Sequence, residues 1–153
     1  MITDTVLIIG ANGQLGSVLS EELQKIYGKD NVIASDVYLN STFDGVFEII
    51  DATDIKAIEN IVNKYAVNQI YHLAAILSAK GEKNPLRTWD LNMSMMLNVF
   101  EVARTSNVKK VFFPSFERLE STISVRVVLP NFLIIFLLHL LLEVRAIEKI
   151  PIS

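Results

Sequence analysis

Residues 6–16 read VLIIGANGQLG, and this stretch decides the fold. Its four leading apolar residues predict a short buried strand, and Gly10, Gly13 and Gly16 follow at every third position. Glycines permit a tight turn and let a pyrophosphate approach the backbone. Apolar residues then recur at helical spacing, at Leu15, Val18, Leu19, Leu23 and Ile26. The stretch therefore predicts a phosphate-binding turn whose helix points its free N–H groups at the anion.

The rest of the chain alternates strand and helix patterns. Short apolar strands are predicted at residues 31–35, 46–50, 69–73, 110–113 and 123–129. Helices are expected after the glycine turn, after Thr53 or Asp54, and from Pro85 onward. This order predicts an α/β, Rossmann-type doubly wound domain. Its mainly parallel sheet has five to six strands with helices on both faces.

Composition excludes several classes of function. The 153 residues carry a net charge of −3, so nucleic acid is not an expected partner. The chain has no cysteine, which excludes a disulfide framework and a thiolate nucleophile. Its two histidines, His72 and His139, lack metal-ligand spacing, so no metal site is predicted. The first residues lack the positive charge of a signal peptide, and we expect a cytoplasmic protein.

An acid ends the second predicted strand. Asp36 lies 20 residues after Gly16, where a carboxylate accepts the ribose hydroxyls of a dinucleotide and repels a 2′-phosphate. This favours NAD over NADP as the cofactor. The alternative for Asp36 is a turn residue at a strand end.

Two further strand ends supply candidate cofactor contacts. Asp51 and Ala52 follow the third strand, where they either edge the adenine or start the next helix. Ala74 and Ala75 follow the fourth strand, where their small side chains either admit a cofactor or serve tight helix–sheet packing. His72, inside the same apolar strand, is more typical of a core histidine than of a catalyst.

The end of the chain differs from the rest. All six glycines lie at or before Gly81, and residues 132–142 are almost entirely apolar. Eleven residues are too few for a membrane-spanning helix, which needs about 20. A membrane is therefore not an expected partner. We expect residues 1–116 to form one portion and residues 117–153 an atypical apolar tail.

The motifs together resemble a known family. The glycine turn and the strand-end acids occur with AAILSA at residues 74–79 and WDLNM at residues 89–93. From about Val6 to Ser115 the chain resembles the NAD-dependent L-threonine 3-dehydrogenases. These belong to the extended short-chain dehydrogenase/reductase, or NAD-dependent epimerase/dehydratase, superfamily.

The resemblance implies an activity and a set of site residues. The reaction would be hydride transfer from L-threonine to NAD, giving 2-amino-3-ketobutyrate, by an enzyme that can form homodimers. Ser78 would lie near the substrate, and Ser115 would be a catalytic hydroxyl. The implied cofactor contacts are Gly10, Asn12, Gly13, Gln14, Leu15, Gly16, Asp36, Asp51, Ala52, Leu73, Ala74, Ala75 and Asn92.

The chain departs from the family after Ser115. Phe116 stands where the family has a second hydroxyl, and none of the four tyrosines is followed by lysine at the fourth position. The family's Tyr-x-x-x-Lys general base and its C-terminal substrate domain are thus missing from this sequence. We expect a truncated chain, weakly active or inactive, whose tail arises from an out-of-frame or otherwise aberrant end. A non-catalytic NAD-binding remnant and a fragment of a nucleotide-sugar epimerase or reductase remain alternatives.

Overall fold

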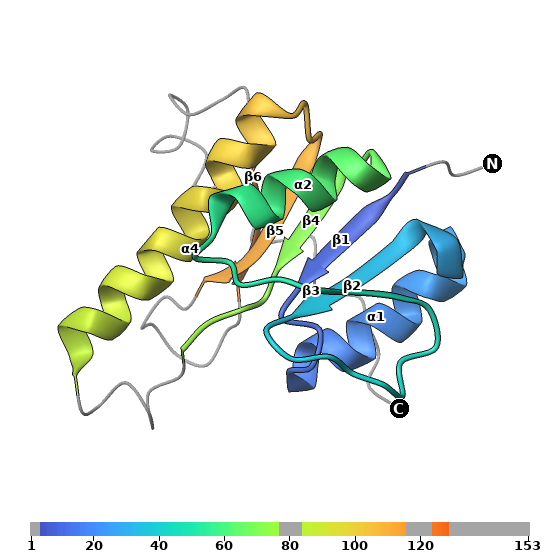
Figure 1. Cartoon of the computed structure of the whole chain (residues 1–153), viewed down its shortest axis with the longest axis horizontal. Coiled ribbons are helices and arrows are strands. Elements are labelled where there is room, and N and C mark those ends of the chain that lie inside the picture. The colour runs from blue at the N-terminus through green and yellow to red at the C-terminus, as the bar shows by residue number, and fades with distance from the viewer. Residues whose placement is uncertain (1–3, 77–83, 116–123, 129–153) are drawn as a thin grey trace.

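Six strands form one sheet in the order β3-β2-β1-β4-β5-β6 (Figure 1). The computed structural model describes residues 4–76, 84–115 and 124–128. The strands are β1 (Val6–Ile9), β2 (Val32–Asp36), β3 (Val46–Ile49), β4 (Gln69–His72), β5 (Lys110–Ser115) and β6 (Ser124–Val128). The first five are parallel, and β6 pairs antiparallel with β5. The prediction of a mainly parallel, Rossmann-type sheet is confirmed.

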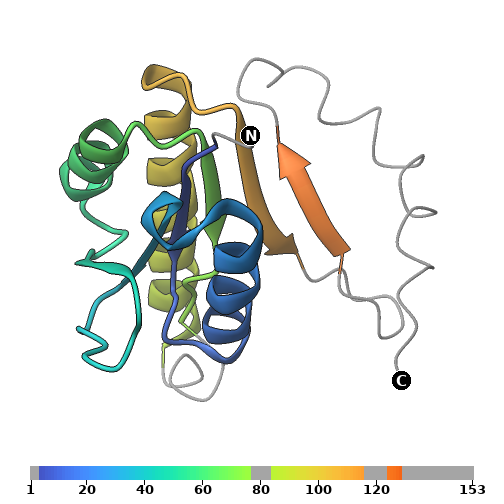
Figure 2. The same cartoon turned by 90° about the vertical axis from the view of Figure 1, so that its right-hand side faces the viewer.

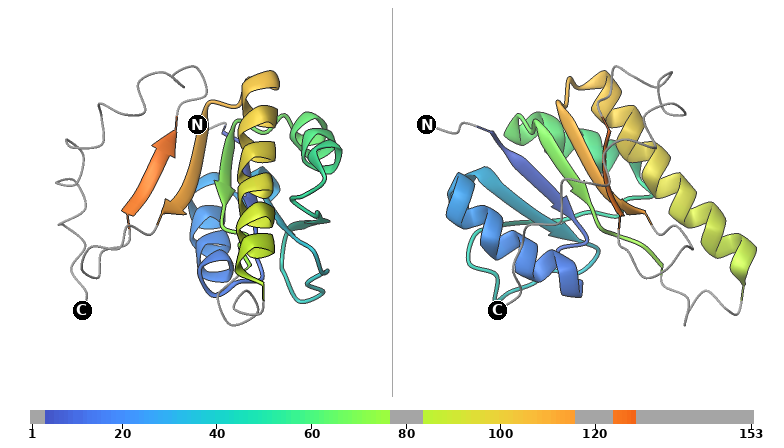
Figure 3. Two further views of the ribbon diagram at one scale, coloured as in Figure 1. Left: turned by 90° about the vertical axis from the view of Figure 1, so that its left-hand side faces the viewer. Right: turned by 180° about the vertical axis from the view of Figure 1, so that it is seen from behind.

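Helices cover both faces of the sheet. They are α1 (Gln14–Tyr27), the short 3-10 helix η1 (Lys29–Asn31), α2 (Ile55–Tyr65) and α4 (Pro85–Thr105). Figure 2 shows α1 on one face and α2 and α4 together on the other, and Figure 3 shows the same layers from the side and from behind. Each of the three described α-helices follows a parallel strand, as doubly wound folds require.

The central strand β1 explains why the sheet is buried on both faces. Its four residues are at most 1% exposed. Leu7 and Ile9 pack in a core with residues of α2 and α4, whereas Val6 and Ile8 pack with Leu23 of α1. A strand with two covered faces needs apolar residues at every position, which is the pattern of residues 6–9.

Helix α1 packs through fewer large residues than its apolar spacing predicts. Leu15, Val18 and Ile26, which follow the helical spacing, are 59%, 62% and 57% exposed. The buried positions of α1 are instead Gly16, Ser20 and Leu23. The small residues bring the helix close to the sheet, and Ser20 satisfies its hydroxyl by donating to the Gly16 carbonyl at 2.7 Å.

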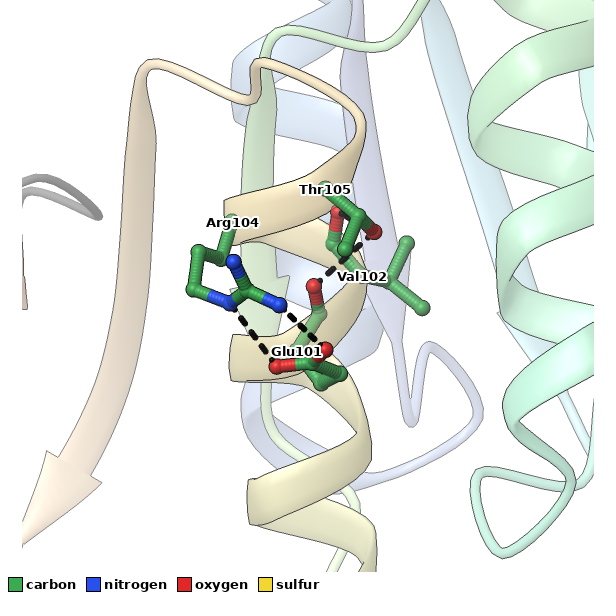
Figure 4. Close-up of polar contacts among 4 residues, drawn as sticks. All are labelled: Glu101, Val102, Arg104 and Thr105. Atoms are coloured by element: carbon green, nitrogen blue, oxygen red, sulfur yellow. Dashed lines mark hydrogen bonds and ion pairs between the residues drawn. The ribbon is translucent and has the colours of Figure 1, made fainter.

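The long helix α4 is capped at its start and carries an exposed ion pair near its end. Asn84 caps its start by accepting from the Arg87 N–H, and Pro85 occupies its first turn. Near its end Arg104 makes two hydrogen bonds to the Glu101 carboxylate, at 3.0 and 2.6 Å (Figure 4). This contact lowers the pKa of Glu101.

Candidate dinucleotide-binding site

Four chain segments meet at the carboxyl edge of the sheet. Because β1, β2, β3 and β4 are parallel, the residues that follow them emerge side by side. Gly10 and Ala11 both donate their N–H groups to the Ser35 carbonyl at 2.9 Å. On the other side of β1, the Leu73 N–H donates to the Ile9 carbonyl at 2.8 Å. The glycine turn is thus anchored to both neighbouring strands.

Two of the glycines are required by close backbone contacts. Gly10 has φ +96°, and a Cβ there would lie 2.6 Å from the Ala74 nitrogen. A Cβ on Gly16 would lie 2.2 Å from the Gly10 carbonyl oxygen and 2.7 Å from the Ala11 Cα. Any side chain at either position would push the turn away from β4 or from α1. The turn therefore forms a cradle lined by main-chain atoms.

The start of α1 is open to a ligand. Its N-cap residue, Gly13, has no side chain and makes no side-chain capping bond, and the first turn contains no acid. Asn12, Gly13, Gln14 and Leu15 are all exposed. The first N–H groups of a helix carry a partial positive charge and need partners. A phosphate is well suited to this position.

Asp36 is held next to the turn by two backbone groups. Its Oδ2 accepts from the Asn12 N–H at 3.0 Å, and its Oδ1 accepts from the Val37 N–H at 2.8 Å. The Asn12 side chain in turn donates to the Tyr38 carbonyl at 2.8 Å. The carboxylate is therefore fixed at the end of β2, beside the glycine cradle.

The segment after β3 is a tight, bonded turn. Asp51 is exposed, and its Oδ1 accepts from the Thr53 N–H at 2.9 Å and from the Thr53 hydroxyl at 2.7 Å. Ala52 is 2% exposed. The sequence reasoning missed Asn98, whose side-chain amide donates to the carbonyls of Ala52 and Thr53. The feature of the sequence that could have indicated Asn98 is its position between apolar residues of a predicted helix.

The segment after β4 is held by α4. Leu73 and Ala74 are partly buried and Ala75 is exposed. Asn92 accepts from the Ile76 N–H at 2.8 Å and donates to the Ile76 carbonyl at 3.2 Å. Asn92 thus pairs with the backbone at the end of this segment.

His72 is a core residue of β4. It is 6% exposed, and its Nδ1 has no hydrogen-bond partner in the part of the chain that the structure describes. Burial lowers the pKa of His72 to about 4. The ring is therefore neutral at physiological pH and contributes no positive charge to this edge.

Of the two predicted reaction residues, one lies outside the described segments and the other is the last residue of one of them. Ser78 lies outside the described residues, as does His139. Ser115 ends β5, where its backbone is in register with Ser124 of β6. Its position at a strand end puts it on the same edge of the sheet as the glycine turn.

The sheet order and the glycine turn define the chain as a Rossmann-type α/β protein with the turn that is typical of dinucleotide-binding folds. A model of the NAD dependent epimerase/dehydratase family matches residues 6–116, and the chain belongs to this family.

Relatives and solved structures agree with this assignment. An uncharacterized epimerase/dehydratase of Staphylococcus aureus (strain USA300) is 41% identical over 114 residues, which cover 72% of this chain and 35% of the relative. A GalE-like L-threonine dehydrogenase from Cupriavidus necator, in its holo form, is 44% identical with a TM-score of 0.67. That match covers 70% of this chain and 35% of the other. The L-threonine dehydrogenase of Clostridium difficile is 42% identical, with a TM-score of 0.68 and coverage of 74% and 36%.

The chain thus spans about a third of the length of the relatives that it matches. Within the described residues, no helix is both long enough and apolar enough to cross a membrane.

Proposed function

We propose that this chain forms the cofactor-binding part of an NAD-dependent oxidoreductase, and that L-threonine is the substrate of the whole enzyme. The observation that carries the proposal is the open start of α1 against the glycine cradle, with Asp36 held at its side. A diphosphate and an adenosine ribose are the two groups that this pair of features recognises.

The described residues offer a contact to each part of NAD. The pyrophosphate would be held by the backbone between Gly10 and Gly16, with Asn12, Gln14 and Leu15 at its exposed side. The ribose would be held by Asp36 and the adenine side edged by Asp51 and Ala52. The segment of Leu73, Ala74 and Ala75, supported by Asn92, would line the nicotinamide half. Bound NAD supplies a hydride acceptor to this edge of the sheet.

L-threonine as the substrate class is supported by two observations. Solved L-threonine dehydrogenases match this chain at 42% to 46% identity. The sequence also contains AAILSA at residues 74–79 and WDLNM at residues 89–93, two motifs that resemble that family. In this proposal Ser78 contacts the amino acid and Ser115 supplies a hydroxyl to the reacting alcohol.

We further propose that the 153 residues bind NAD with little or no turnover. The general base of the family is a tyrosine whose pKa is lowered by a lysine four residues later, and this pair does not occur in the sequence. Residues 1–116 would act as the NAD-binding portion. Residues 117–153, which follow the matched family segment, would form a distinct tail.

Calorimetric titration of the chain with NAD and with NADP tests the proposal. We expect NAD to bind and NADP to bind at least about tenfold more weakly, because Asp36 repels a 2′-phosphate. Asp36→Ala should lose much of the NAD affinity and narrow the difference between the two cofactors. Asp30→Asn, which removes an exposed acid from η1, is the matched control and should behave as wild type.

Activity is measured as NADH formation with L-threonine. Binding without turnover supports the proposal for this chain. A chain that binds neither cofactor contradicts it, and rapid NADH formation contradicts the proposed need for the missing tyrosine and lysine.

A further inference from the structure

Two asparagines of α4 bond to two different loops of the site edge. Asn92 pairs with the backbone of Ile76, after β4. Asn98 bonds to the backbone of Ala52 and Thr53, after β3. Under the proposed function these loops lie on the nicotinamide side and the adenine side, respectively. One helix therefore contacts both halves of the candidate site.

The Asn98 side chain donates to two carbonyl groups through one amide nitrogen. Its Nδ2 donates to the Ala52 carbonyl at 3.1 Å and to the Thr53 carbonyl at 2.9 Å. Its neighbour Val99 is 0% exposed, so the helix is firmly packed at this point. The amide consequently attaches the loop to a fixed support.

The loop's own hydrogen bonds give it shape but do not attach it to α4. The Asp51 side chain accepts from Thr53, and the Asp51 carbonyl accepts from the Asp54 N–H at 2.9 Å. The start of the loop is tied to β2 because the Ile50 N–H donates to the Asp36 carbonyl at 2.9 Å. Asn98 supplies the bonds that join the other side of the loop to the helix layer.

We propose that Asn98 is a positioning residue for the adenine half of the cofactor. It fixes residues 51–53 so that the Asp51 carboxylate and the Ala52 backbone stay at the carboxyl edge of the sheet. This inference rests on the proposed function, and it assigns a role to a side chain that itself touches only protein.

Adenosine monophosphate is the probe for this role because it contains the adenine half alone. We expect Asn98→Ala to weaken binding of both adenosine monophosphate and NAD by about tenfold, since two hydrogen bonds that order the loop are lost. Asn92→Ala should weaken NAD more than adenosine monophosphate, because Asn92 contacts the other loop. Asn63→Ala removes an exposed asparagine of α2 and should match wild type.

A second variant separates positioning from a general loss of stability. Asn98→Asp keeps the shape of the side chain but replaces the donating amide nitrogen with a carboxylate oxygen, which repels the two carbonyls. At neutral pH it should bind adenosine monophosphate more weakly than Asn98→Ala. As the pH falls and the carboxyl group gains a proton, it can donate one bond again, and its affinity relative to wild type should recover. Circular dichroism of each variant shows that it is folded.

The outcomes distinguish the two proposals. If the wild-type chain binds neither NAD nor adenosine monophosphate, the proposed function is wrong. If wild type binds and Asn98→Ala binds adenosine monophosphate equally well, the positioning role of Asn98 is overturned and the proposed function stands. Equal losses for both ligands in Asn98→Ala, with pH-dependent recovery in Asn98→Asp, support the role.

Discussion

Two helices start at the same edge of the sheet, and their starts are built in opposite ways. Helix α1 begins after Gly13, which offers no capping side chain. Helix α2 begins after Asp54, whose carboxylate accepts from the N–H groups of Lys56 and Ala57 at 2.9 and 3.3 Å. Both N-cap residues have extended backbone angles, so the side chain makes the difference.

The start of α2 serves stability, whereas the start of α1 is suited to binding. A capping aspartate satisfies the first donors of a helix and contributes about 1 kcal/mol to folding. The chain uses that contribution at α2, where the loop is closed by its own bonds. At α1 the N-cap residue has no side chain to bond these donors, and an anion can take the place of the cap. An uncapped helix start beside a glycine turn is thus a sign of a ligand site.

The largest effect is expected from Gly16→Ala. The new methyl group would meet the Gly10 carbonyl and the Ala11 Cα, which are both backbone atoms and cannot rotate away. We expect loss of NAD binding and a fall of about 3 kcal/mol in the free energy of unfolding. Titration calorimetry and urea denaturation measure the two effects. Ser17→Ala, one residue along the helix, should be close to wild type, and a Gly16→Ala chain with normal affinity would refute the cradle.

Gly13→Asp should convert the start of α1 into a copy of the start of α2. The backbone angles there suit any residue, but a Cβ would lie 3.3 Å from the Gly10 carbonyl oxygen, a close contact that requires a small shift of the turn. We expect NAD affinity to fall about a hundredfold, because the carboxylate competes with the phosphates for the same donors and repels them. The melting temperature should be unchanged or higher.

Gly13→Asn is the matched neutral control for this variant. It can cap the helix without adding charge, so it should lose less affinity than Gly13→Asp. Equal losses in the two variants would mean that charge is not what the site recognises.

Asp54→Ala tests the capped helix. Loss of the two hydrogen bonds to Lys56 and Ala57 should lower the free energy of unfolding by about 1 kcal/mol. NAD affinity should change little, because the cap faces the helix and not the cradle. Urea denaturation and titration of the same preparation check both statements. A large loss of NAD affinity with unchanged stability would contradict the view that the start of α2 serves stability and the start of α1 serves binding.

The smallest effect is expected at Glu48, which ties α2 to the edge strand β3. Its Oε1 accepts from the Lys64 ammonium at 2.6 Å and from the Tyr65 hydroxyl at 2.5 Å. These contacts lower the pKa of Glu48 below 4.5. A carboxyl group whose pKa is lower in the folded than in the unfolded chain stabilises the fold at pH values above its pKa in the unfolded chain. This contribution is lost as the pH falls through its pKa in the folded chain.

Glu48→Gln should therefore destabilise the chain at neutral pH by less than Asp54→Ala does, because the Lys64 side chain is 58% exposed and screened by solvent. The difference in the free energy of unfolding between Glu48→Gln and wild type should shrink as the pH is lowered below 4.5. Urea denaturation at several pH values measures it. A difference that stays constant over this range would show that the ion pair contributes nothing.

The sequence was informative where the backbone itself is constrained. The positive φ of Gly10 and the close approach at Gly16 leave few residue choices, so the turn was predictable, as were the buried strands. The exposure of three apolar residues of α1 was not predictable, because periodicity does not reveal how many of the apolar positions the sheet covers. These residues are Leu15, Val18 and Ile26. The apolar neighbours of Asn98 draw attention to its amide, but its partner Ala52 lies 46 residues away in the chain and local patterns do not identify it.

The contact of Gly10 with the peptide after β4 has a consequence for sequence variation. The atoms that a Cβ on Gly10 would strike are the nitrogen and Cα of Ala74 and the carbonyl carbon of Leu73. Every residue type has these atoms, so exchanging the side chain at position 74 would not relieve the restriction at position 10. Methods that detect paired substitutions should not detect this contact, because position 10 is restricted to glycine whereas position 74 can vary independently of it.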